Sequence, residues 1–247
     1  MARAQFVAPR CLVFIFFYHP CSSVFIRGCS LFPVKAIVTC GPSYEPIDEV
    51  RRLTNFSTGE LGVLLANALT DAGIETLCLK GEQATWPGEC RAARVTSFST
   101  NDDLAANLKG CAKEGDVDAV FHAAALCDYR VGAVCDAAGN ESAAAKIPTG
   151  SGALTMTLVP TVKVIARLRP MFPNAALVGW KYELVGGRTD AVAKAFAQIE
   201  ANDTTACVVN GAAFGPGFGL CQPPDSVREF ADKTALCHGL VNWLKRR

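Results

Sequence analysis

The sequence is poor in the residue patterns that mark metal sites and disulfide frameworks. It has only three histidines, and although it has twelve cysteines, no two of them are spaced Cys-x-x-Cys. Structural zinc sites usually combine such pairs with each other or with histidines, so we predict no structural zinc. Cys78, Cys207 and Cys237 lie in apolar runs. We therefore expect buried free thiols in a reducing compartment.

Long apolar runs and an excess of one charge are also missing. The most apolar stretch, residues 11–18, is too short to cross a bilayer. The 24 basic and 23 acidic residues are interspersed, which argues against the concentrated basic face that a nucleic-acid partner requires. We expect neither a nucleic acid nor a membrane as a partner. Half of the residues are apolar, so the chain can bury a sizeable core.

Strand and helix patterns alternate from Val34 onward. Such alternation predicts an α/β fold, a Rossmann-like doubly wound, mostly parallel sheet with helices on both faces, whose ligand loops follow the carboxyl ends of the strands. Strands are expected at 34–39, 74–79, 94–98, 117–123, 153–159, 175–182, 204–209 and 227–230. Helices are expected at 59–72, from Ser99 or Thr100 to 112, and at 161–168, 188–201 and 232–245. Residues 134–145 read as a mobile loop, and residues 211–219 as a glycine loop.

A long polar loop, residues 39–59, separates the first expected strand from the first expected helix. In α/β folds this junction receives phosphate on backbone N–H groups and on the helix N-terminus. The loop has neither Gly-x-Gly-x-x-Gly nor the Gly-Lys-Ser/Thr ending of a P-loop, and no Tyr-x-x-x-Lys pair occurs in the chain. A nicotinamide-dependent oxidoreductase is therefore disfavoured. A structural role stays open, with Gly41 and Pro42 forming a turn and Ser57 or Thr58 capping the helix.

The loop resembles the opening motif of the phosphopantothenoylcysteine synthetase family, the synthetase-type C-terminal domain of the DNA/pantothenate metabolism flavoproteins. That motif reads Gly-Pro-Thr-x-Glu-Pro-Ile-Asp-x-Val-Arg, then Asn-x-Ser-Ser-Gly. The matching residues here, in order, are Gly41, Pro42, Glu45, Pro46, Asp48, Val50, Arg51, Asn55, Ser57 and Gly59. The resemblance extends from Val34 to the closing helix.

The resemblance implies a ligase of coenzyme A biosynthesis that forms an amide bond. Such an enzyme activates the carboxylate of 4'-phosphopantothenate as an acyl-nucleotide, using CTP or ATP with Mg²⁺, and then couples it to cysteine. The resemblance also implies a homodimer. The flavin-dependent decarboxylase domain that often precedes this domain has no counterpart in the sequence, so we expect no flavin.

The resemblance assigns roles to individual residues. The implied catalytic residues are Asn55, which would hold the acyl-nucleotide, and Lys146. The implied nucleotide-binding residues are Gly41, Ser57, Thr58, Gly59, Ala125, Asp128, Lys146, Trp180, Lys181 and Glu183. The implied substrate-binding residues are Arg51, Asn55 and Asn210. Asp128 could also lie near the magnesium ion, and no other protein ligand to a metal is expected.

Several positions depart from the family pattern. Pro148 stands where a second lysine is usual, and Gly211 stands where an aspartate is usual. Leu126 and Cys127 are bulkier than the usual residues, which affects the expected fit of the base.

Without the resemblance, several residues have ordinary structural interpretations, and Asn55 could equally be a residue that only shapes the loop. Lys146 would be a solvated surface lysine, Asp128 a turn former and Trp180 a core residue. His122, in an apolar strand, reads as packed rather than as a base. A diverged relative that binds nucleotide without ligating anything is the alternative function.

Residues 1–33 differ from the rest because they contain three arginines but no lysine and no acid. They fit a signal peptide in outline, an organelle transit peptide, or upstream sequence that is not part of the natural protein. We favour the third interpretation because the family resemblance begins only at Val34. We therefore predict a non-core extension over 1–33, a single synthetase-like domain over 34–247 and a cytoplasmic location.

Overall fold

The computed structural model describes residues 34–142 and 144–247, so the predictions made for 1–33 lie outside the described part. Its centre is an eight-stranded sheet in the order β12-β11-β10-β9-β6-β1-β4-β5. The strands are β1 Lys35–Cys40, β4 Glu75–Gly81, β5 Arg94–Phe98, β6 Ala119–His122, β9 Ala176–Tyr182, β10 Ala206–Asn210, β11 Phe218–Gln222 and β12 Ser226–Phe230. The first six pair in parallel, whereas β11 and β12 are antiparallel.

In chain order the six parallel strands lie as 3-2-1-4-5-6, so the direction of winding reverses between β1 and β6. This arrangement confirms the predicted doubly wound, mostly parallel sheet. The central strands are apolar because both of their faces are covered. On β1, Ile37 contributes to one core, and its neighbours Ala36 and Val38 contribute to the core on the opposite face.

Helices cover both faces of the sheet. α1 (Glu60–Asp71) and α5 (Lys233–Lys245) share one core with Ala36 and Val38. The other face is covered by α2 (Asn101–Lys113), the short helices η2 (Val164–Arg167) and α3 (Leu168–Met171), and α4 (Arg188–Asn202). Leu236, Leu240 and Leu244 of α5 are all buried, as their spacing predicts.

Two of the helices begin at the polar residues that the sequence indicates. Thr100 accepts a hydrogen bond from the backbone N–H of Asp103 and is the N-cap of α2. Asp232 accepts one from the backbone N–H of Ala235 and is the N-cap of α5. The expected helix at 161–168 is partly wrong, because a 3-10 turn begins only at Val164. The Thr161 hydroxyl bonds to the carbonyl of Cys127 instead.

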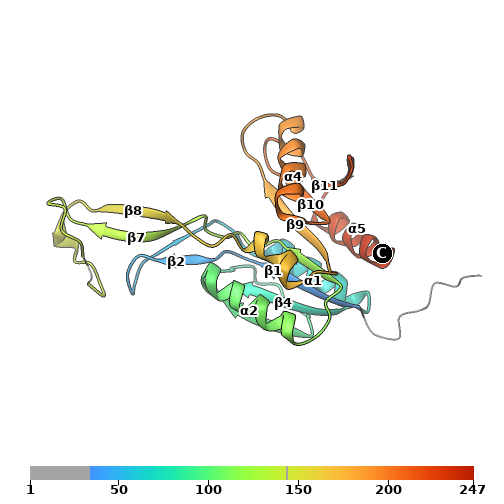
Figure 1. Cartoon of the computed structure of the whole chain (residues 1–247), viewed down its shortest axis with the longest axis horizontal. Coiled ribbons are helices and arrows are strands. Elements are labelled where there is room, and N and C mark those ends of the chain that lie inside the picture. Colours follow the sequence, from blue (N-terminus) through green and yellow to red (C-terminus); the bar gives the residue numbers. More distant parts are fainter. Residues whose placement is uncertain (1–33, 143) are drawn as a thin grey trace, which may run out of the picture. The chain divides into compact units, whose positions relative to one another are not determined.

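Two antiparallel ribbons lie outside the large sheet. The sequence predicted one of their four strands, at 153–159, and missed the other three strands and both pairings. A short ribbon joins β2 (Tyr44–Pro46) to β3 (Arg52–Thr54) inside the first polar loop. A longer ribbon, which we call the arm, pairs β7 (Tyr129–Cys135) with β8 (Thr155–Pro160). Figure 1 shows β2, β7 and β8 leading away from the large sheet together.

Two predicted loops need correction. The expected mobile loop at 134–145 is wrong at its start, because Val134 and Cys135 belong to β7 and Cys135 also bridges to Glu141. The Asp136 carboxylate then closes a turn by accepting the N–H groups of Ala138 and Asn140. The glycine loop ends at Gly217, because Phe218 already begins β11.

The cysteines Cys78, Cys207 and Cys237 are buried free thiols, as predicted. Among the described residues, no helix combines the length and the apolar character needed to cross a membrane.

Candidate functional site

The loop that follows β1, here called the first loop, meets the loop that follows β6, the second loop. They meet at the point where the winding of the sheet reverses. Ala125 donates its N–H to the carbonyl of Gly41 over 2.9 Å, and Ser43 donates to the carbonyl of Ala125 over 3.2 Å. Parallel pairing therefore continues past both strand ends, with Pro42 opposite Ala125. In open α/β sheets, ligands bind at this reversal, so the chain forms a candidate site where its topology predicts one.

Gly41 and Gly59 bring the first loop close to the start of α1. Both residues have φ near +78°, a conformation that side chains other than glycine rarely adopt. A Cβ atom added at Gly41 would lie 2.8 Å from the Cβ of Ala84, and one added at Gly59 would lie 2.9 Å from the same atom. Trp86 donates its N–H to the carbonyl of Thr58. The segment after β4 thus packs tightly against this loop.

The N-cap of α1 is Gly59, and no side chain among the described residues caps this helix. The expectation that Ser57 or Thr58 caps it is therefore wrong, although the Glu60 N–H does donate to the Thr58 hydroxyl over 3.3 Å. A helix start without a side-chain cap presents backbone N–H groups and a partial positive charge. This is the feature that receives a phosphate in related folds.

Asn55 links the two loops. Its side-chain amide donates to the carbonyl of Leu126 over 2.8 Å, while the residue stays exposed at the edge of the sheet. Phe56 beside it is also fully exposed. Of the residues assigned from the resemblance, the structure therefore brings together Gly41, Ser57, Thr58, Gly59, Asn55, Ala125 and Asp128, all in these two loops.

Asp128 is exposed at the end of the second loop, where its carbonyl accepts the N–H of Thr161. The described residues contain no cluster of three or more His, Cys, Asp or Glu side chains able to hold a metal ion. A magnesium ion here would need phosphate oxygens for most of its ligands. A single exposed carboxylate fits that arrangement.

His122 is buried at the end of β6. Its Nδ1 lies 2.9 Å from the Thr39 hydroxyl, which also accepts the N–H of Ala124 over 3.3 Å. Burial lowers the pKa of His122 to about 4, so the ring is neutral near pH 7. The reading of His122 as a packed histidine is confirmed.

A pocket of about 410 Å³ opens below the second loop, on the face covered by α2 and η2. His122, Leu126, Asp128 and Asn101 are among its lining residues. Asn101 is 2% exposed, and its amide donates to the carbonyls of Cys127 and Val162 and to the Thr161 hydroxyl. Its Oδ1 has no partner among the described residues. Sequence reasoning missed Asn101 because a polar residue at a helix start is usually only part of a cap.

A third group of assigned residues lies at the ends of β9 and β10. Glu183 donates its N–H to the carbonyl of Asn210, and its carboxylate contacts Lys194 over 2.5 Å and Lys181 over 3.2 Å. The hydrogen bond from Lys194 is the main cause of the lowered pKa of Glu183. Glu183 is thus paired with two lysines, one of which is the assigned residue Lys181. Trp180 is partly buried against the core of α1 and α5.

The structure gives a physical reason for the glycine at 211. Its φ is +112°, and a Cβ atom added there would lie 2.3 Å from the carbonyl oxygen of Glu183. The aspartate usual in the family cannot occupy this backbone without a rearrangement.

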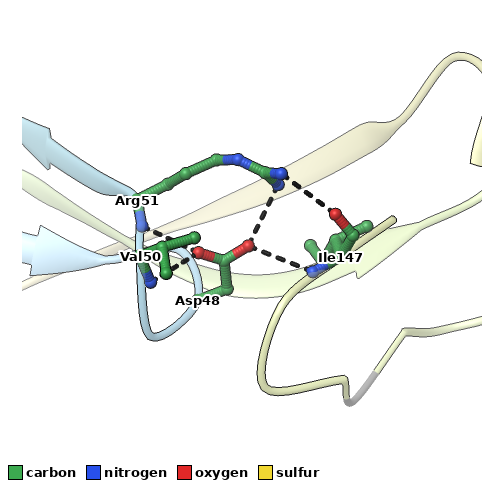
Figure 2. A network of polar contacts seen from close by, with 4 residues as sticks. All are labelled: Asp48, Val50, Arg51 and Ile147. Carbon is green, nitrogen blue, oxygen red and sulfur yellow. Dashed lines mark hydrogen bonds and ion pairs between the residues drawn. The ribbon is translucent and has the colours of Figure 1, made fainter. Parts of the chain in front are cut away.

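Arg51 and Lys146 lie apart from these strand ends, on the short ribbon and the arm. Figure 2 shows the Arg51 guanidinium bonded to the Asp48 carboxylate over 3.0 Å and to the carbonyl of Ile147 over 2.9 Å. The N–H of Ile147 also donates to Asp48 over 3.2 Å. Lys146 is exposed next to the buried Ile147. The structure thus bonds the segment that carries Lys146 to Arg51 and Asp48.

The charge of Asp48 is stabilised in this network. Burial acts to raise the pKa of Asp48, but the N–H groups of Val50, Ile147 and Arg51 and the Arg51 guanidinium outweigh it, so the pKa is lowered. The side chain of Asp48 is only 1% exposed.

Known proteins resemble this chain over most of its length. A coenzyme A biosynthesis bifunctional protein CoaBC of Thermococcus kodakarensis is 29% identical over 181 residues, which are 73% of this chain and 42% of that protein. A protein of the same name from Bacillus subtilis is 30% identical and covers 72% and 42%. A cysteine/cysteine sulfinic acid decarboxylase of an unknown prokaryote is 29% identical and covers 75% and 48%. The chain spans less than half the length of these curated relatives.

Solved structures share the fold. The DNA/pantothenate metabolism flavoprotein of Streptococcus pneumoniae has a TM-score of 0.76 at 20% identity, covering 86% of this chain and 99% of that one. A mutant of Cab2 in complex with phosphopantothenate-cysteine has a TM-score of 0.68 at 15% identity, covering 87% and 86%. The model of the DNA/pantothenate metabolism flavoprotein C-terminal domain matches residues 32–227, and the chain belongs to this family.

Proposed function

We propose that this chain is a phosphopantothenate–cysteine ligase. It activates the carboxylate of 4'-phosphopantothenate as an acyl-nucleotide, with release of pyrophosphate, and the amine of cysteine then displaces the nucleotide. The bond formed is an amide, and the nucleotide is the leaving group. Family membership, the names of the CoaBC relatives and the ligand of the Cab2 complex all favour this reaction.

The observation that carries the proposal is the contact between Asn55 and the second loop. Its amide bonds to the carbonyl of Leu126 at the reversal of the sheet, close to the start of α1 and to Asp128. A carboxamide held there can donate to the oxygen that gains charge as the acyl carbon reacts. We assign Asn55 this role and also contact with the phosphopantothenate.

We propose that the nucleotide lies along the carboxyl edge of the sheet. Ser57, Thr58 and the glycines 41 and 59 would receive its phosphates at the open start of α1, which supplies N–H donors and a partial positive charge. The small side chain of Ala125 would allow the nucleotide to approach the backbone of the second loop closely. Trp180, Lys181 and Glu183 would flank it at β9, and Asn210 would contact the substrate.

The base and the metal follow from the same proposal. The bases of CTP and ATP can both be bound by backbone hydrogen-bonding groups. The first experiment therefore compares the two nucleotides. Mg²⁺ would be held by the triphosphate, with Asp128 as the protein carboxylate nearest to it in the second loop. The ion would supply positive charge to the phosphates.

We propose a homodimer in which the arm of one copy serves the site of the other. Arg51 lies between β2 and β3 and Lys146 between β7 and β8, and Figure 1 shows β2, β7 and β8 leading away from the large sheet. A second copy would bring both cations to the triphosphate or to the substrate phosphate. Sedimentation of the full chain tests this assembly, and a monomer at the concentrations used for activity would contradict it.

The experiment that tests the ligase is pyrophosphate release by the full chain with Mg²⁺ and either CTP or ATP. Phosphopantothenate and cysteine are added separately and together. The ligase requires release that depends on phosphopantothenate, and an amide product only when cysteine is also present. Nucleotide binding without release would instead support the diverged, non-catalytic relative, for which Pro148 and Gly211 are the relevant departures.

A further inference from the structure

The first residues of α1 and α5 form an ion pair beside the expected phosphate loop. The ammonium of Lys233, the first residue of α5, is hydrogen-bonded to the carboxylate of Glu60, the first residue of α1. The two residues are 173 positions apart in sequence. The contact therefore depends on the packing of the two helices.

The Lys233 position is unfavourable for its own helix. Cations stabilise the C-terminal end of a helix and are disfavoured at the N-terminal end. The N-cap Asp232 offsets part of this cost, but its carboxylate already accepts the N–H of Ala235. A residue that breaks a local preference often has a functional reason, and the contact with Glu60 supplies a candidate.

The Glu60 position is favourable for its helix but unfavourable for an anionic ligand. Its carboxylate belongs to the residue directly after Ser57, Thr58 and Gly59, and its N–H already bonds to Thr58. An unpaired carboxylate there would repel a triphosphate bound at the same helix start. The Glu60 side chain is 24% exposed, so solvent screens it only in part.

Two other cations assigned to the ligands are engaged elsewhere. Lys181 is paired with Glu183, and Arg51 is bonded to Asp48 and Ile147 on the short ribbon. Lys233 keeps 42% of its side chain exposed while it contacts Glu60. Its charge therefore offsets that of Glu60 next to the first turn of α1.

We infer that Lys233 is a positioning residue for triphosphate binding: it neutralises Glu60 and holds that carboxylate away from the phosphates. The inference rests on the proposed function, because it takes the phosphates to lie at the start of α1. Lys233 acts through Glu60 and need not touch the nucleotide.

The test compares Lys233→Met, Glu60→Gln and the double variant with the wild type. Affinity for Mg-CTP and Mg-ATP is measured by calorimetry, and KM and kcat by pyrophosphate release. Lys233→Met should weaken nucleotide binding about tenfold, because the carboxylate becomes unpaired. Glu60→Gln should bind at least as well as the wild type. The double variant should return to within about threefold of the wild type, with the KM for cysteine unchanged throughout.

The control variant is Arg91→Met, which removes the ion pair with Asp71 at the other end of α1. It should leave nucleotide affinity unchanged. Equal losses in Lys233→Met and Glu60→Gln would mean that the pair only clamps the two helices. A double variant as weak as Lys233→Met would mean that Lys233 contacts the nucleotide directly. Either result overturns the inference.

The outcome for the wild type separates this inference from the proposed function. If the wild type binds nucleotide but forms no amide, the ligase proposal fails, and the affinities of the variants still decide the role of Lys233. If the wild type binds neither nucleotide, both proposals are overturned.

Discussion

The N–H of Ile147 donates to the carboxylate of Asp48 although the two residues are 99 positions apart in sequence. The same carboxylate accepts the N–H groups of Val50 and Arg51 and binds the Arg51 guanidinium (Figure 2). One side chain thus fixes the turn of the short ribbon and the arm segment that carries Lys146.

Replacing Asp48 by alanine should release this segment of the arm. The bond between Lys146 and Ile147 is a trypsin site, and Ile147 is 2% exposed in the intact protein. Loss of the carboxylate removes its hydrogen bonds, so local opening should become more frequent and cleavage after Lys146 about tenfold faster. Mass spectrometry of the fragments measures the rate. Glu49→Ala is the control, and equal rates in the two variants would contradict the role of Asp48.

Replacing Asn55 by alanine should slow turnover by about 10²–10³, the effect of losing one oxyanion donor. The fold should be retained, because the residue is exposed. Single-turnover pyrophosphate release and a thermal melt measure the two effects. Wild-type turnover in a folded Asn55→Ala protein would remove Asn55 from the reaction.

Replacing Lys146 by alanine should raise the KM for nucleotide about tenfold, because a cation is lost from the triphosphate. The control is Lys109→Ala, which removes an exposed lysine from α2. Both variants should melt at the wild-type temperature. Unchanged nucleotide kinetics in Lys146→Ala would mean that Lys146 is an ordinary solvated surface lysine with no role in nucleotide binding.

Replacing Gly211 by aspartate should not improve activity, although aspartate is usual at this position in the family. The added Cβ would overlap the carbonyl of Glu183, and φ is +112°. Strain of this kind costs on the order of 1–3 kcal/mol of folding free energy. Chemical denaturation measures the loss. A variant as stable as the wild type would show that the loop after β10 adapts easily.

The stability of the protein should depend on pH through His122. Its pKa in the folded protein is about 4, below the value of about 6.5 expected when the chain is unfolded. The unfolded state therefore binds more protons between these values. The contribution of the neutral ring is complete above about pH 6.5 and is lost as the pH falls toward 4.

Denaturation of the wild type and of His122→Asn at pH 7.5, 6 and 5 tests this dependence. The pH dependence of the wild type minus that of the variant isolates the imidazole, because the other titrating groups are common to both. The wild type should lose about 2 kcal/mol more than the variant between pH 7.5 and pH 5. Parallel curves would mean that His122 does not titrate as its burial implies.

The sequence predicted most of the large sheet because most of its strands are short apolar runs separated by amphipathic helices. It missed β2 and β3 because each has only three residues and β2 ends in proline. Such short segments do not show the alternation of apolar and polar residues that marks a strand. It missed the start of the arm for a different reason. Small residues in β7, such as Gly132 and Ala133, resemble a loop until the pairing with β8 is known.

The candidate site could be predicted only where the chain itself brings residues together. The loops after β1 and β6 meet because parallel strands end at one edge, so the assignment of Asn55 and Asp128 to one place follows from topology. Lys146 could not be placed in this way, because its position depends on Asp48. The pairing of Lys233 with Glu60 depends on how α5 packs on α1, which no local pattern indicates.

The contact between Asn55 and Leu126 has a consequence for sequence drift. Asn55 binds the main chain of residue 126, Ser43 accepts the main-chain N–H of Cys127, and Asn101 donates to the carbonyl of that same residue. None of these three hydrogen bonds involves the side chain of residue 126 or 127. The side chains themselves are constrained differently, because the Cys127 thiol donates to the carbonyls of Ser43 and Leu53 and Leu126 packs against the core that contains Ile37. The course of the second loop is therefore set by main-chain bonds, whereas any replacement at 126 or 127 must still fit the space beside these neighbours.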